Sequence, residues 1–237
     1  MRRRIALSRA LKSLFLRLRL HRLTGPLDKV LLQASYLAQW SRWYAEHVPP
    51  TCQDFVSRAD PEARSALYEF LFSTEHLDGA ITYLEFGVAA GDTFKWWSER
   101  NRHPDSRFVG FDTFTGLPEP WGYFPRGAFS TEGQVPDIRD SRCQFVVGMF
   151  QQTLPLNLPS RAHRLVVHLD ADLYSSTLFV LTTLAPCLMK GDILIFDEFG
   201  VAQHEFRALH DFVSAYLIKY TVLAATDNCS QVAIQLI

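Results

Sequence analysis

The first candidate site in the sequence is a turn that contains two glycines and follows a strand with an acidic residue near its end. The run from Leu84 to Ser98 reads as an apolar strand that passes over small residues directly into an amphipathic helix. Gly87 and Gly91 let a ligand approach the backbone closely, the first helical amides are free donors, and Glu85 places a carboxylate near the end of the strand. The spacing is neither the dinucleotide-binding fingerprint nor a P-loop. It indicates a nucleotide-type ligand site or, alternatively, only a tight connection.

Acidic residues also end the other predicted parallel strands. In an open α/β sheet, ligands bind beyond the carboxyl ends of the strands. Asp112 ends the second strand, about twenty-five residues after the first glycine of the turn, where an acid can accept both hydroxyls of a ribose. The alternative is that Asp112 only caps the bend at residues 113–116.

Four further acids follow two neighbouring strands, at 164–170 and 192–197. They are Asp170, Asp172, Asp197 and Glu198. Converging carboxylates repel one another unless a cation or shared protons relieve them. Oxygen ligands without nearby cysteine pairs favour a hard ion such as magnesium over zinc. The alternative is that Asp172 or Glu198 caps the following segment.

Two histidines accompany these acids. His168 stands inside a strand and is expected to be a hydrogen-bonded core residue. His204 follows the strand at 192–197 and is an additional candidate base.

Strands and helices alternate from residue 80 onward. Strands are predicted at 82–88, 107–112, 143–147, 164–170, 192–197, 220–226 and 231–236, and helices at 27–47, 61–72, 92–102, 174–188 and 203–219. Nearly continuous apolar strands are typical of a parallel sheet covered on both faces, and the short connection at residues 227–230 favours a hairpin. The sequence thus predicts an α/β fold: a Rossmann-like, doubly wound, seven-stranded sheet, mostly parallel, with a C-terminal antiparallel hairpin and N-terminal helices. Residues 116–142, the lid segment, lack periodicity and are expected to form a lid or binding loop.

Composition and charge divide the chain. Its 237 residues, 48% of them apolar, can bury a substantial core. The four cysteines are widely spaced, which argues against a zinc site or a disulfide scaffold and suggests a cytoplasmic location. Residues 1–22 carry eight basic and no acidic side chains, whereas the other 215 residues hold 16 basic and 25 acidic ones, a net charge of −9. The basic segment suits a helix that packs on the body or on a second subunit, an anionic membrane, or a mitochondrial-type presequence.

Five segments together resemble class I S-adenosyl-L-methionine (SAM)-dependent methyltransferases, most closely the magnesium-dependent macrocin O-methyltransferase type. They are residues 84–88, 110–118, 148–155, 168–177 and 196–199, of which the Asp-x-Asp-Leu-Tyr-x-Ser-Thr stretch is the most distinctive. The resemblance implies that SAM contacts Glu85, Gly87, Ala89, Gly91, Asp92, Thr93, Asp112 and Thr113. It also implies that Asp170, Asp197 and Glu198 bind Mg²⁺, with Asp170 also catalytic, near the reacting hydroxyl. At the position of Glu198 the family often has a second aspartate.

The resemblance therefore implies an O-methyltransferase that acts on a hydroxyl of a sugar or a similar small natural-product-like acceptor. Charge and periodicity divide the chain into a basic amphipathic segment (1–24), a helical cap (25–79) and a SAM-binding methyltransferase domain (80–237) that forms a single globular unit with the cap. The alternatives are a hydroxylase-like or other oxidoreductase on the same fold, and a noncatalytic module that docks through its basic N-terminal helix. We expect a homo-oligomer, and peripheral membrane contact through residues 1–22 is a further option. Nucleic acid is not an expected partner, because the basic residues are confined to this segment.

Overall fold

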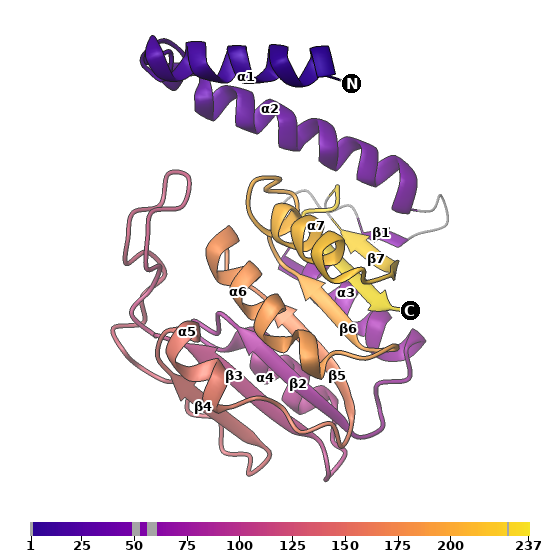
Figure 1. Ribbon diagram of the computed structural model, residues 1–237. Coiled ribbons are helices and arrows are strands. Elements are labelled where there is room, and N and C mark those ends of the chain that lie inside the picture. The colour runs from indigo at the N-terminus through magenta and orange to yellow at the C-terminus, as the bar shows by residue number, and fades with distance from the viewer. Residues whose placement is uncertain (1, 49–52, 56–60, 227) are drawn as a thin grey trace.

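The computed structural model describes residues 2–48, 53–55, 61–226 and 228–237 (Figure 1). The strands are β1 (Gln53–Phe55), β2 (Ile81–Phe86), β3 (Arg107–Asp112), β4 (Cys143–Val147), β5 (Arg164–Leu169), β6 (Ile193–Phe196), β7 (Tyr220–Thr226) and β8 (Gln231–Leu236). The α-helices are α1 (Arg2–Arg17), α2 (His21–His47), α3 (Pro61–Thr74), α4 (Asp92–Arg100), α5 (Phe150–Thr153), α6 (Tyr174–Leu184) and α7 (Glu205–Tyr216). Two 3₁₀ turns, η1 (Leu154–Leu156) and η2 (Ala185–Cys187), extend α5 and α6.

The strands form one mixed sheet in the order β1-β7-β8-β6-β5-β2-β3-β4. Only β8 runs against its neighbours, and it pairs antiparallel with both β6 and β7. The predicted doubly wound sheet with its C-terminal hairpin is confirmed. Residue 227, which belongs to the predicted turn at 227–230, lies outside the described residues. An eighth strand, β1, was not predicted and pairs parallel with β7 at the sheet edge. Three residues are too few to show a strand pattern in the sequence.

Alternating side chains of the central strands build two cores. In β2, Leu84 and Phe86 enter one apolar cluster, whereas Ile81 and Tyr83 enter the other. Successive residues of a strand point to opposite faces, so a strand that is apolar throughout is buried on both sides. This double burial is what holds the carboxyl ends of the strands in fixed positions.

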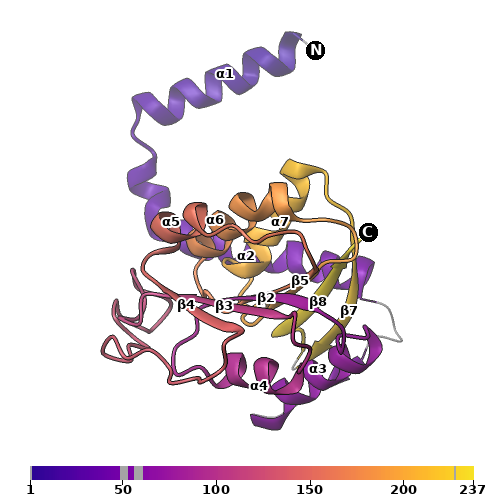
Figure 2. The same ribbon diagram turned by 90° about the horizontal axis from the view of Figure 1, so that it is seen from below.

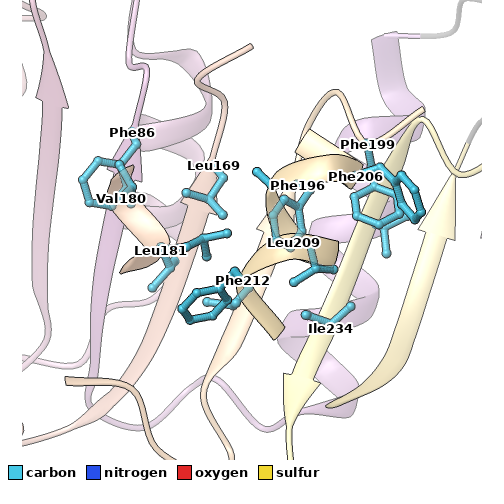
Figure 3. Packing of buried hydrophobic residues seen from close by; sticks show 14 of the residues in the cluster. Phe86, Leu169, Val180, Leu181, Phe196, Phe199, Phe206, Leu209, Phe212 and Ile234 are labelled. Carbon is cyan, nitrogen blue, oxygen red and sulfur yellow. The ribbon is translucent and has the colours of Figure 1, made fainter. Parts of the chain in front are cut away.

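Helices cover each face of the sheet as separate layers. Figure 2 shows α5, α6 and α7 on one face and α3 and α4 on the other. On the first face, Phe212 of α7 and Leu181 of α6 pack above Leu169 and Phe196, as Figure 3 shows. Each of these fully buried apolar side chains contributes about 1.5–3 kcal/mol to folding.

The N-terminal helices meet the body at one end only. Trp43, which is 5% exposed, packs against Phe199 and Phe206 and donates from its indole nitrogen to the Tyr220 hydroxyl at 2.7 Å. Figures 1 and 2 show α1 and the first half of α2 standing away from the sheet. The expected boundary between residues 24 and 25 falls inside α2. Among the described residues, no helix is both long and apolar enough to cross a bilayer.

Candidate active site

A single cleft at the carboxyl ends of β2, β3, β5 and β6 collects most of the predicted site residues. Its volume is about 290 Å³, close to the lower end of the range for small-molecule sites. On the β2–β3 side it is lined by Gly87, Ala89, Asp112 and Thr113. On the β5–β6 side it is lined by Asp170, Asp172, Asp197, Glu198 and Arg64. The lid segment contributes aromatic and apolar side chains between these two walls.

Gly87 joins the two walls of the cleft. Its φ is +92°, a left-handed conformation that favours glycine. A Cβ added there would lie 1.8 Å from the carbonyl oxygen of Asp170. Glycine therefore lets the turn after β2 pass directly against the end of β5, which places the glycine turn beside the acids.

Asp112 organises the β2–β3 wall with its carboxylate. Oδ2 accepts hydrogen bonds from the amides of Val88 and Ala89, at 2.7 and 2.9 Å. Oδ1 accepts from the amide of Phe114 at 2.7 Å, which caps the following bend. A carboxylate has about four acceptor positions, so capping does not exhaust its capacity for a ligand hydroxyl. The capping alternative and the ligand prediction are thus compatible.

Glu85 lies on the other side of its strand. Its side chain is 1% exposed, accepts a hydrogen bond from the Tyr83 hydroxyl and lies 3.8 Å from His168 Nδ1, away from the residues that line the cleft. Burial raises the pKa of Glu85, although His168 opposes the shift. The contact of Glu85 with SAM stays a prediction. In this arrangement Glu85 lies behind the β2–β3 wall, on the side away from the cleft.

The remaining predicted cofactor residues stand at the start of α4, outside the cleft lining. Gly91, at φ +86°, lies beneath Pro136 of the lid segment, whose side chain would be 2.7 Å from an added Cβ. Asp92 is exposed and Thr93 is partly buried in the first turn of α4. Gly91 thus allows the lid segment to pack closely on this turn, because a side chain at position 91 would overlap Pro136.

The acids after β5 and β6 meet because these strands are adjacent and parallel. Burial raises the pKa of Asp170 well above its ordinary value, and the nearby Asp197 raises it further. Burial, with a further contribution from Asp197, raises the pKa of Asp172 to about 7. Asp172 also has a φ of +57°, which is unusual for a residue with a side chain. Clustered carboxylates with shifted pKa values in a cleft mark a candidate functional site.

Two residues that the sequence reading did not select belong to this acidic group. Nη2 of Arg64 donates to Asp197 Oδ2 at 2.6 Å, and this side chain comes from α3, 133 residues earlier. Glu205, fully buried at the start of α7, accepts from the amide of Glu198 at 2.9 Å. Burial raises the pKa of Glu205 well above its ordinary value. Nothing in the local sequence marks Arg64, whereas Glu205 stands only seven residues after Glu198.

The two histidines have different surroundings. His168 is fully buried, with Nε2 3.3 Å from the Tyr68 hydroxyl and 3.7 Å from Asp197 Oδ1. Burial would lower the pKa of His168, but Asp197 and Glu85 together raise it to about 10. His204 lies outside the cleft lining, and its Nδ1 accepts from the amide of Tyr174 at 3.2 Å.

The predicted metal ligands supply suitable atoms but are not arranged around one point. Asp170, Asp197 and Glu198 offer carboxylate oxygens on one rim, the donor type that magnesium prefers. Within the described ranges, no three acidic, histidine or cysteine side chains converge closely enough to hold an ion. At Asp197, Arg64 donates to one carboxylate oxygen and Gln231 to the other, and both oxygens keep a further acceptor position.

The lid segment has its own small aromatic cluster. Trp121 stacks on Phe124, and both rings contact Phe129. Two contacts join the lid segment to residues that follow β5 and β6. Ser175 donates to Glu119 at 3.0 Å, and the ring of Trp121 meets the His204 ring edge-on. Trp121 and Phe129 also line the cleft, so the lid presents aromatic surface to whatever binds there.

Comparison with known proteins agrees with this geometry. The model of the macrocin-O-methyltransferase (TylF) family matches residues 128–231. The calicheamicin methyltransferase CalS11 is 20% identical, with 85% of this chain and 91% of that chain covered and a TM-score of 0.55. The O-methyltransferase NovP is 21% identical, with 72% and 78% covered and a TM-score of 0.58. An O-methyltransferase from Bacillus cereus in complex with SAH is 14% identical, with 87% and 90% covered and a TM-score of 0.50.

At these identities the solved structures show a shared fold. Among curated protein sequences, none matches this chain. The resemblance found in the sequence is confirmed: the family model matches residues 128–231, less than half of the chain, and the fold is shared with solved O-methyltransferases.

Proposed function

We propose that the enzyme methylates a hydroxyl of a sugar or of a similar small natural-product-like acceptor, with the help of a magnesium ion. The observation that carries this proposal is the single cleft in which the glycine turn and the acids face each other. A methyl donor on the turn side and a hydroxyl on the acidic side would then meet. Holding both reactants in line removes much of the entropic cost of the displacement.

The β2–β3 wall is the proposed donor side. Ala89 and Thr113 flank Asp112, whose carboxylate retains acceptor capacity for ribose hydroxyls. Gly87 lines the cleft without a side chain, which lets a ligand approach its backbone closely. The same arrangement in the family is the basis for proposing Gly91, Asp92 and Thr93 as further contacts when SAM is bound.

The β5–β6 wall is the proposed acceptor side, with Asp170 as the base. Burial raises its pKa, which makes the ionised carboxylate a stronger base, and the acceptor hydroxyl would pass its proton to a carboxylate oxygen. Asp170, Asp197 and Glu198 would hold the divalent ion, which lowers the pKa of a coordinated hydroxyl when bound. The aromatic lid residues Trp121 and Phe129 would pack on the acceptor and exclude water.

Calorimetry with SAM, with and without Mg²⁺, tests this proposal on the parent and on Asp170→Asn. We expect SAM to bind both proteins, and Mg²⁺ to bind only the parent. Asp105→Asn, at an exposed position distant from the cleft, is the matched control and should bind both ligands as the parent does. No heat with SAM in the parent would contradict the donor site.

Turnover is tested with TDP-rhamnose, the acceptor named for the 20–22% identical CalS11 structures. We expect SAM-dependent methylation of this or another sugar hydroxyl, and loss of turnover in Asp170→Asn. Product formation without SAM would instead favour an oxidoreductase. SAM binding without methylation of any acceptor in a panel of sugars and phenols would favour a noncatalytic module.

The N-terminal helices are the proposed oligomerisation surface. Leu7, Leu11 and Leu14 of α1 are 68%, 57% and 49% exposed, although each is a large apolar side chain. A second copy offers a complementary charge, because residues 1–22 are basic and the rest of the chain carries −9. Light scattering should show a dimer or larger assembly that Leu11→Asp weakens. A monomeric parent that binds anionic vesicles would favour the membrane instead.

A further inference from the structure

Helix α2 carries two apolar faces, and one of them packs on the body of its own chain. Tyr36, Trp40 and Trp43 lie on this first face and contact the apolar core, and the Arg207 guanidinium of α7 lies 5.1 Å from the centre of the Tyr36 ring. The second face is a row of four side chains, called the α2 seam: Leu27, Val30, Ala34 and Leu37. At 3.6 residues per turn, the two faces point about 130° apart around the helix axis.

The α2 seam is open to solvent along its length. Leu27, Val30 and Leu37 are 54%, 64% and 51% exposed, and Ala34 between them is exposed as well. Figures 1 and 2 show the first half of α2 standing away from the sheet. Single exposed apolar side chains are normal on a protein surface, whereas an aligned row of them indicates a contact surface.

The spacing of the α2 seam is that of a coiled coil. Its members follow one another at intervals of three, four and three residues, as the a and d positions of a heptad do. The same alternation continues along α2, through Leu23 before the seam and through Ser41 and Tyr44 after it. A heptad pattern sustained over about three heptads predicts that this face pairs with another helix.

A second copy of this chain fits the α2 seam because the seam is symmetric. Its intervals read the same in both directions, so an antiparallel copy brings Leu27 against the partner's Leu37, and Val30 against the partner's Ala34. We propose that α2 pairs with α2 of a second copy as an antiparallel coiled coil through the α2 seam. This inference rests on the proposed homo-oligomer, and it adds the helix, the direction and the facing residues of the contact.

Side-chain size favours the antiparallel direction. In a parallel pair each position faces itself, so Ala34 would face the partner's Ala34 and leave unfilled space between the helices. In the antiparallel pair, the small Ala34 faces the larger Val30, and Ser41 faces the larger Leu23. Layers that set a large side chain against a small one fill the space between two helices without voids.

Charge favours the same direction. Residues 1–22, just before the α2 seam, carry eight basic and no acidic side chains. A parallel pair would set two such segments side by side, and their like charges would oppose association. An antiparallel pair sends the two segments to opposite ends of the contact. The α2 seam itself has no charged member, so pairing buries no unpaired charge there.

Disulfide cross-linking tests the direction and the face. The double variant Leu27→Cys/Leu37→Cys should form a covalent dimer on oxidation, because position 27 lies opposite position 37 of the partner. Leu27→Cys alone should not, because its two thiols then lie about 15 Å apart along the helix axis, beyond the reach of a disulfide. Ser35→Cys/Arg42→Cys, at two exposed positions on the polar face, is the control and should stay monomeric on a non-reducing gel. The parent, which has the same four natural cysteines, sets the background.

Light scattering measures the strength of the pairing. Val30→Asp places a carboxylate among apolar side chains of the α2 seam, so the dissociation constant of the assembly should rise at least about 100-fold. Ser35→Asp adds the same charge on the polar face and should leave the assembly unchanged. Both positions are exposed in the single chain, so both variants should fold, which circular dichroism checks.

The outcomes separate this inference from the proposal on which it rests. A covalent dimer of Leu27→Cys alone, as abundant as that of the double variant, would mean parallel pairing and overturn the inference. An assembly that Val30→Asp does not weaken would overturn the α2 seam and leave the homo-oligomer standing. A monomeric parent, with or without binding to anionic vesicles, would overturn both, and SAM calorimetry would still test the donor site separately.

Discussion

The two halves of the cleft use the same kind of residue in opposite ways. On the β2–β3 side, the carboxylate of Asp112 accepts hydrogen bonds from three backbone amides, two of them in the turn after β2. On the β5–β6 side, Asp170 and Asp172 have raised pKa values because burial and the charge of Asp197 disfavour ionisation. In the first half, backbone amides satisfy the single acid. In the second half, Arg64 and the buried His168 face a larger number of carboxylates.

This difference indicates which acids can still gain free energy when a ligand binds to them. Backbone amides that lie within a turn satisfy an acid at little cost, and such an acid mainly stabilises the fold. Acids that crowd one another in a half-buried position destabilise the fold until a cation, a proton or a substrate joins them. We therefore expect substitutions in the first half to weaken folding, and substitutions in the second half to relieve strain while they impair chemistry.

The largest effect is expected at the joint between the halves, in Gly87→Ala. The new Cβ would lie 1.8 Å from the carbonyl oxygen of Asp170 at a φ of +92°. Steric overlap and the left-handed backbone together should lower the free energy of unfolding by about 3–5 kcal/mol. Denaturant unfolding measures this loss.

Gly191→Ala is the matched control for that substitution. Gly191 has a φ of +93°, but nothing lies within 4 Å of an added Cβ. It should lose only the backbone part, about 1–2 kcal/mol. Equal losses in the two variants would show that the contact with the end of β5 is unimportant.

A smaller loss of stability is expected from Asp112→Asn, on the β2–β3 side of the cleft. The amide keeps one acceptor oxygen but turns an NH₂ group toward backbone N–H donors, so the free energy of unfolding should fall by about 2–3 kcal/mol. SAM affinity, measured by calorimetry, should fall with it. Asp105→Asn, exposed in the loop before β3, should change neither. A stable Asp112→Asn would remove the contrast between the two halves.

Much of the fold follows from periodicity, and its gaps have physical causes. The bounds of β3, β4 and β7 agree with the predicted ranges, because these strands are bounded by turns and carry clear apolar patterns. The short β1 was missed because its pairing with β7 is a long-range contact that three residues do not encode. The break between α1 and α2 at residues 18–20 contains no proline or glycine to signal it.

The site was harder to predict than the fold, because side-chain direction and distant partners decide it. The strand ends placed Asp170 and Asp197 together, since adjacent parallel strands share an edge. Glu85 shares a face with Tyr83, two residues earlier, and this alternation indicates that it points behind the turn. Arg64 reaches the site from a helix 133 residues before its partner, so no spacing in the sequence could reveal it.

In the strained half, Asp172→Asn should stabilise the protein at high pH. The pKa of Asp172 is about 7 in the folded chain against an ordinary value of 3.8, so the folded state binds the extra proton more tightly. The parent therefore has its full stability below about pH 4 and loses it as the pH rises toward 7 and above.

Asparagine does not titrate and tolerates the φ of +57° at this position well. With allowance for partial exposure, the variant should gain about 1–2 kcal/mol over the parent between pH 5 and pH 8. Denaturant unfolding at the two pH values, in chelator, measures the gain, and Asp105→Asn should show none. A gain of the same size at both pH values would mean that backbone conformation, not charge, is responsible.

The smallest effect is expected where the lid segment joins the acidic half, in Ser175→Ala. The hydroxyl donates to Glu119 at 3.0 Å in an exposed position, so its loss should change the free energy of unfolding by less than about 0.5 kcal/mol. If the lid shapes the acceptor side alone, the KM for the acceptor should rise while the Kd for SAM stays constant. Ser73→Ala removes a comparable exposed serine–glutamate hydrogen bond on α3 and should alter neither constant. A change in SAM affinity in Ser175→Ala would mean that the lid acts on both halves, and the division of the cleft into a donor and an acceptor side would then fail.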